Sequence, residues 1–212
     1  KMANSNGAFG LRPIGKVGSG VNSTGTTEYR IASDNSNAIF QGSPVIPLAA
    51  GVIDIVGAAA GGTVGLVGVF YGCEYVSSTT GEVIFSNTYP GSGADSNFPV
   101  KAFVYDDPMQ QFVIASDASL TSEATARTAV FANANFSSGT SGSTTTGMSS
   151  AALAVSTIAT TANLNLRIMG IVDDVENADF AASGIGVIVR LNNHFNSPNG
   201  AIAGGTVSTT GV

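Results

Sequence analysis

The sequence predicts an all-β fold, an antiparallel β-barrel or sandwich with less than about 15% helix. Four apolar segments, rich in Val, Ile, Phe and Tyr, occupy residues 64–76, 83–85, 100–105 and 111–116. Gly, Pro, Asp and Ser residues that favour turns separate them, and such runs are typical of antiparallel hairpins. We therefore expect the four segments to form a meander at the centre of the domain.

The chain of 212 residues is predicted to form one β domain, residues 27–196, with an extended N-terminal arm, residues 1–26, and a flexible C-terminal tail, residues 197–212. Only 10% of the residues are charged, against roughly 25% in an average soluble protein. This composition suits a β protein whose neutral surface packs against other copies or another protein, although a loop-rich β domain would show it too. The net charge of −6 argues against direct binding of nucleic acid, which requires Lys and Arg to replace counterions.

The predicted arm has no apolar periodicity, because Gly and Asn separate its few apolar residues. Those side chains bury too little area to offset the ~1–2 kcal/mol per residue that backbone ordering costs. We therefore expect the arm to become ordered only against a neighbouring copy or another protein. Its two basic residues either meet acidic groups of that partner or are simply solvated. The candidate contact residues are Phe9, Leu11, Arg12, Ile14 and Lys16.

Beyond residue 116 the pattern is less regular. Residues 163–172 and 185–192 alternate between apolar and polar positions, which predicts a hairpin with a long acidic connection. Residues 119–128 have a possible helix start at Ser119 or Thr121. Residues 129–132 resemble a further short strand. The Ser-, Thr- and Gly-rich residues 137–150 are expected to form a long polar loop that is flexible, an exposed binding loop or a loop ordered by a neighbour.

The apolar sides of the alternating segments predict the core. In residues 100–105, one face carries the small apolar side chains and the other carries Lys101, Phe103 and Tyr105. The residues expected to be buried are Ile31, Val67, Val69, Phe85, Val104, Phe112, Ile114, Leu166, Ile168, Val187 and Val189.

Residues that carry chemistry are few, and we expect neither an enzyme nor a bound cofactor or metal. The single histidine, His194, follows two Asn residues at the end of a predicted strand, where a surface or hydrogen-bonding role is expected. Cys73 lies in the middle of an apolar strand and is expected to be a small core residue. Residues 10–16 have the spacing of a phosphate-binding loop, but Val17 stands where Ser or Thr should bind Mg²⁺. The acidic residues 173–179 are the best candidate for a cation site, although they lack the order of an EF-hand.

Several segments together resemble a known protein family. They begin at Gly10 (GLRP), Tyr29 (YRIAS), Gly68 (GVFYGCEYV), Phe103 (FVYDDP), Gly142 (GSTTTGMS) and Val189 (VRLNNH). In this order they are similar to the capsid decoration, or cement, proteins of short-tailed bacteriophages of marine bacteria and cyanobacteria. The resemblance implies a β-rich virion protein that binds the outer surface of the major capsid protein lattice as a homotrimer. It carries over no catalytic or ligand residue, and a minor head or tail component is an alternative. From the acidic charge and the lack of a long apolar run, we expect no direct contact with nucleic acid or a membrane.

Two other classes of function are open on the sequence alone. A carbohydrate-binding domain of an adhesin would require Tyr71, Tyr75 and Tyr89 to stack on sugars from one exposed face, and we expect Tyr75 to be buried. A hydrolase would require two carboxylates to converge across a cleft from distant segments.

Overall fold

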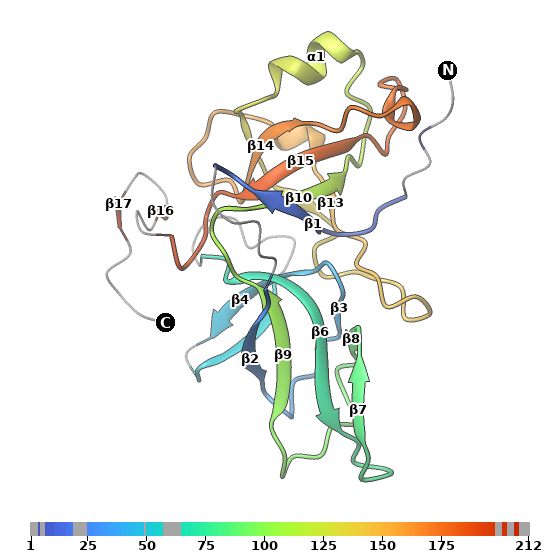
Figure 1. Ribbon diagram of the computed structural model, residues 1–212, viewed down its shortest axis with the longest axis vertical. Coiled ribbons are helices and arrows are strands. Elements are labelled where there is room, and N and C mark those ends of the chain that lie inside the picture. The colour runs from blue at the N-terminus through green and yellow to red at the C-terminus, as the bar shows by residue number, and fades with distance from the viewer. Residues whose placement is uncertain are drawn as a thin grey trace.

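A computed structural model describes residues 4, 7–18, 25–48, 50–56, 65–197, 201–202 and 206–207. The protein is nearly all β, with 43% strand and 7% helix, as the alternating segments predict. Its antiparallel sheets are arranged in the manner of a sandwich and do not close into a barrel within the described residues. Figure 1 shows one large sheet in the upper half of the molecule and another in the lower half.

The upper sheet has five strands in the order β1-β10-β15-β14-β11. These strands are β1 (Arg12–Lys16), β10 (Gln110–Ala115), β15 (Gly186–Leu191), β14 (Leu166–Ile171) and β11 (Asn133–Ala134). β14 and β15 pair antiparallel, with Leu166 opposite Leu191, so the predicted hairpin with a long connection is confirmed.

The lower sheet has six strands: five in the order β2-β9-β6-β4-β5, and β7, which pairs with β6. They are β2 (Thr27–Ile31), β9 (Val100–Tyr105), β6 (Gly68–Val76), β4 (Pro44–Leu48), β5 (Val52–Ile55) and β7 (Val83–Ser86). Only the first step of the predicted meander, the pairing of β6 with β7, is formed. The second step is wrong because β9 pairs with β6 and not with β7, and the last step is wrong because β9 and β10 lie in different sheets. Both edges of β9 are already paired, with β2 and with β6. The short connection through Asp106 and Asp107 therefore carries the chain from one sheet to the other.

The shorter elements lie outside the two large sheets. They are β3 (Ile39–Phe40), β8 (Thr88–Tyr89), β12 (Phe136–Ser137), β13 (Ala152–Leu153), β16 (Ala201–Ile202), β17 (Thr206–Val207), α1 (Glu123–Thr128), and the 3₁₀ turns η1 (Val155–Thr157) and η2 (Val175–Asn177). Helix α1 begins after Ser122, whose side chain accepts a hydrogen bond from the Thr125 N–H, so the start lies just beyond the two predicted residues. The strand predicted for residues 129–132 is wrong, because these residues form the turn that ends α1.

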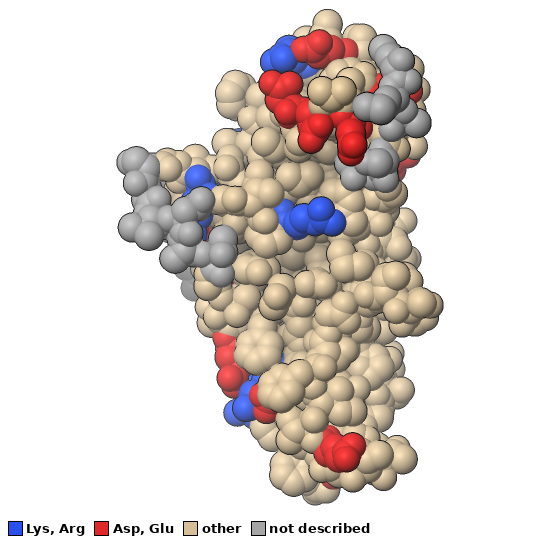
Figure 2. Space-filling model, turned by 45° about the vertical axis from the view of Figure 1, so that its right-hand side comes forward, with Lys and Arg blue, Asp and Glu red and all other residues tan. Residues whose placement is uncertain are grey.

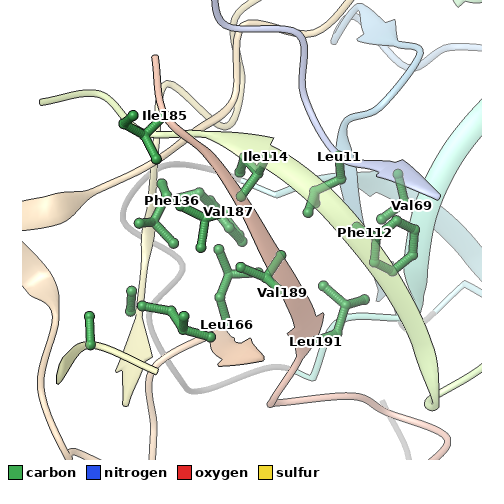
Figure 3. Close-up of a cluster of buried hydrophobic side chains, with 14 of the residues drawn as sticks. Leu11, Val69, Phe112, Ile114, Phe136, Leu166, Ile185, Val187, Val189 and Leu191 are labelled. Carbon is green, nitrogen blue, oxygen red and sulfur yellow. The ribbon is translucent and has the colours of Figure 1, made fainter. Parts of the chain in front are cut away.

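Two apolar clusters form the core, one under each sheet. Strand β6 joins them, because Val69 belongs to the first cluster and Phe70 to the second. Figure 3 shows the first cluster, in which side chains of β10 and β15 point toward Phe136 and Leu166. Of the eleven predicted core residues, ten are buried and one is not.

The exception is Phe85, which is 72% exposed. Residues opposite each other in an antiparallel pair share a face, and Phe85 lies opposite Glu74. The Glu74 carboxylate accepts a hydrogen bond from Lys101 on the outer side of the sheet. The alternation of β7 was therefore predicted correctly, but its pairing register turns Phe85 toward solvent.

The N-terminal segment is the second correction. Leu11 is only 2% exposed and belongs to the first cluster, where Figure 3 shows it beside β10. Residues 12–16 form β1, in which Pro13 lies opposite Phe112. The expectation that this segment gains order only from a partner is wrong for residues 11–16, because the chain's own core supplies both apolar surface and strand partners. Residues 19–24 and most of the predicted tail after residue 197 lie outside the described residues, so the tail stays a prediction.

Candidate interaction surface

The outer face of the lower sheet carries large aromatic side chains. Strand β9 buries every second residue and turns Lys101, Phe103 and Tyr105 outward, the faces that the alternation predicts. Tyr71 of β6 is 47% exposed on the same face. We call this surface the aromatic face and define it by Tyr71, Phe85, Phe103 and Tyr105.

A local irregularity in β6 places Tyr71 there. The pairing register between β6 and β9 shifts between Phe70 and Gly72, which is the pattern of a β-bulge and turns a side chain out of the regular alternation. Gly72 also lies close to β7, because a Cβ added there would sit 2.9 Å from the Ser86 carbonyl oxygen. A larger residue at position 72 would therefore push β7 away from β6.

Two adjoining hollows lie on the aromatic face. The first, of about 340 Å³, is lined by residues that include Phe9, Arg12 and Tyr105. The second, of about 360 Å³, is lined by residues that include Phe85 and Phe103. Gln41 and Tyr71 line both hollows, which are therefore adjacent, and we call the two together the groove. None of the described residues that line it is a carboxylate.

Ring contacts fix the first hollow. The Tyr71 and Tyr105 rings meet edge to face, with centroids 5.4 Å apart. The Arg12 guanidinium lies 4.6 Å from the centre of the Phe9 ring, a distance at which a cation is attracted to the ring face. The groove is thus aromatic, with one positive charge at its end.

The polar loop of residues 137–150 is held against the lower sheet. The Asn87 side chain donates a hydrogen bond to the Thr146 carbonyl oxygen at 3.0 Å. The Gln41 N–H donates to the Gly147 carbonyl oxygen at 2.9 Å, and Met148 lines the first hollow. The described loop is therefore fixed by backbone and side-chain bonds, and its end forms part of the groove.

The structure brings together three of the five contact residues predicted from the arm. Phe9, Leu11 and Arg12 line the first hollow. Ile14 is 45% exposed on β1, and Lys16 forms an ion pair with Asp107. Hydrogen bonding from Lys16 lowers the pKa of the Asp107 carboxyl, so this basic residue serves the fold.

Phe103 and Tyr105 are not among the contact residues predicted from the sequence, although the alternation places them on the face opposite the core. The signal that could have found them is their large apolar size on the outer face of an alternating strand, where both are half-buried. The tyrosine platform expected of an adhesin is not formed. Tyr89 is fully buried and packs edge to face against the half-buried Tyr75, whereas Tyr71 is exposed.

His194 lies where the two halves of the molecule join. It forms a parallel bridge with Leu66, the residue that leads into β6. Its Nδ1 accepts a hydrogen bond from the Asn196 N–H at 3.1 Å, so the expected hydrogen-bonding role is confirmed, but the side chain is only 2% exposed. Burial lowers the pKa of His194 to about 4, although Asp106 and Asp107 act in the opposite direction.

Cys73 is buried in the second cluster, as predicted. Desolvation raises the pKa of its thiol to about 12, so the thiol stays protonated and unreactive at neutral pH.

Acidic side chains gather at the end of the molecule beyond the upper sheet, where Figure 2 shows them at the top. Glu123, Asp173 and Asp174 line a hollow of about 430 Å³ there, together with Arg127. Among the described residues no group of three or more His, Cys, Asp or Glu side chains could hold a metal ion. The absence of a cofactor stays a prediction. Most of the remaining surface in Figure 2 is uncharged.

No helix in the described ranges has both the length and the apolar character needed to cross a membrane. Comparison of the chain with protein-family models, with curated proteins and with solved structures found no match.

Proposed function

We propose that this protein is a virion structural protein, a capsid decoration protein that binds the outer surface of a major capsid protein lattice and stabilises the head. The observation that carries the proposal is the aromatic face. It combines four large side chains, two of them about half or more exposed, on a rigid sheet. Exposed apolar surface of this kind marks contact with another macromolecule.

The rest of the molecule fits a role in packing. With 10% charged residues, little of the surface carries groups whose desolvation opposes a protein contact. Tyr and Phe side chains supply large contact areas at a low cost in conformational entropy. Arg12, at the end of the groove, can pair with a carboxylate of the partner and fix the orientation of the contact.

The proposed mechanism is linkage by mass action. A protein that binds only the expanded shell adds its binding free energy to the stability of that shell. A homotrimer that bridges neighbouring capsid subunits would oppose the rupture that pressure from packaged DNA promotes. The resemblance to decoration proteins supports the trimer and the position on the outer surface.

A binding assay tests the proposal. The purified chain is mixed with expanded, DNA-free heads that lack it, and bound protein is measured by sedimentation. The double variant Tyr71→Lys, Phe103→Lys removes two rings of the aromatic face and should weaken binding at least about tenfold. Phe131→Lys is the matched control, because Phe131 is 75% exposed on the turn that follows α1 and should leave binding unchanged.

Three outcomes would contradict the proposal. Wild-type protein that does not bind the heads would remove the decoration function. Binding restricted to one vertex, seen by electron microscopy of the same sample, would favour a minor head or tail component. Equal binding of the double variant and the control would show that the aromatic face is not the contact.

A further inference from the structure

The outer edge of β7 is an open sheet edge with unusual composition. β7 pairs with β6 on one side, and Figure 1 shows no strand on its other side. Its sequence is VIFS. Exposed edge strands are normally protected by Lys, Pro, a bulge or a covering loop, and the regular four-residue pairing of β7 contains none of the first three.

The edge strand of the upper sheet, β1, is protected against pairing with another chain, in contrast to β7. β1 carries Pro13, which has no N–H to donate, and Lys16. Its pairing register also shifts between Pro13 and Gly15. These are the features that prevent a strand edge from pairing with another chain, and β7 lacks them.

The alternation of hydrogen-bonded pairs along β6 and β7 shows which backbone N–H and C=O groups of β7 are free. The Ser77 N–H donates to the Glu82 carbonyl oxygen, and bonded pairs alternate along an antiparallel ladder. Ile84 and Ser86 therefore bond to β6, whereas Val83 and Phe85 direct their N–H and C=O groups to the open edge. Within the described part of the chain, no hydrogen bond reaches these groups from that side.

We propose that β7 pairs antiparallel with β7 of a second copy of this chain, about a two-fold axis that passes between the two Ile84 residues. In this register Val83 of one copy lies opposite Phe85 of the other, and the two pairs exchange four backbone hydrogen bonds. The contact is a property of the isolated chain and does not rest on the proposed function.

Self-pairing is favoured because the strand is complementary to itself. Val83 is 55% exposed and Phe85 72% exposed, and the register places each beside the other across the axis on the same face. Pairs of an aromatic and a β-branched residue are among the stabilising cross-strand pairs. Glu82 would lie opposite Ser86 of the second copy, so the register brings no like charges together.

The contact is small. A pair of four-residue strands covers less than the roughly 1,200 Å² that stable complexes bury, so the dimer should dissociate on dilution. Its two-fold symmetry cannot close a trimer. In an assembly the contact would instead link copies that belong to neighbouring oligomers, where multivalency strengthens it.

Engineered cysteines test the register. Ile84 lies on the proposed axis in a non-hydrogen-bonded pair with a Cα separation of about 4.5 Å, within the range of a disulfide. Ile84→Cys should therefore give a covalent dimer under mild oxidation. Val83→Cys is the matched control, since its two copies would be more than about 7 Å apart and cannot be bridged. The native Cys73 is buried and should not contribute.

Lysine variants test the contact without a new thiol. In sedimentation equilibrium, the mass of the wild-type chain should rise with concentration, and Phe85→Lys should weaken this association about tenfold. Phe131→Lys, of similar exposure, should leave it unchanged. A mass independent of concentration, an equal effect of the two lysine variants, or equal cross-linking of Ile84→Cys and Val83→Cys would overturn the proposal.

Discussion

The two sheets are built alike toward the core and differ on the side that faces away from it. In the upper sheet, Arg167 lies opposite Arg190, and the Arg167 side chain donates to the Asn133 side chain at 3.0 Å. In the lower sheet, the positions of β9 that face away from its buried residues carry Phe103 and Tyr105. Each sheet has its own apolar cluster. Tyr71 and Phe85 are exposed, whereas the half-buried Tyr105 also packs against the first cluster. This difference is the reason for proposing that the lower sheet also makes contact with a partner.

The largest difference between core and outer face should appear in stability. Phe112 is fully buried in the first cluster, and Phe112→Ala should lower the free energy of unfolding by about 3–5 kcal/mol. Phe85→Ala on the aromatic face should change it by less than about 0.5 kcal/mol. Urea unfolding of both variants gives the comparison. A loss above about 2 kcal/mol for Phe85→Ala would place Phe85 in the core after all.

A smaller effect on stability is expected from His194, which lies where the upper and lower halves of the molecule join. His194 is neutral in the folded protein because its pKa is lowered to about 4, whereas the unfolded chain binds a proton below about pH 6.5. The part of the free energy of unfolding that depends on neutral His194 is therefore fully present above pH 6.5. It is lost as the pH falls toward 4, because the unfolded chain gains a proton that the folded protein does not bind. The free energy of unfolding should decrease by about 2 kcal/mol between pH 7 and pH 5.

The variant His194→Gln supplies the control for this pH dependence. Its free energy of unfolding should change little between pH 7 and pH 5, because the titrating group is gone while a polar side chain remains. Urea unfolding at several pH values measures both slopes. Equal slopes in the two proteins would mean that another group causes the loss.

Much of the fold was predictable because strands leave a local signature. The alternation of residues 100–105 gave both the limits of β9 and the residues on each of its faces. Local signals do not contain the partner of a strand, however. The connection through Asp106 is short enough for a hairpin, and only the pairing of both edges of β9 places β10 in the other sheet.

The contact surface was predictable only in part. Alternation showed that Phe103 and Tyr105 share a face, but it cannot show which face another layer covers. Phe85 was assigned to the core for this reason, since the register against Glu74 turns it outward. Leu11 was assigned to a partner contact because its apolar neighbours are distant in sequence and meet it only in the folded protein.

The proposed function requires that the aromatic face hold this protein in an assembly. A cryo-electron microscopy map of the intact particle that contains the chain tests it most directly. We predict density for the chain outside the major shell, with Tyr71, Phe103 and Tyr105 buried against neighbouring subunits. In the same map the acidic end beside Asp173 should face solvent. A map in which the aromatic face is exposed while another surface makes the contacts would contradict the proposed function.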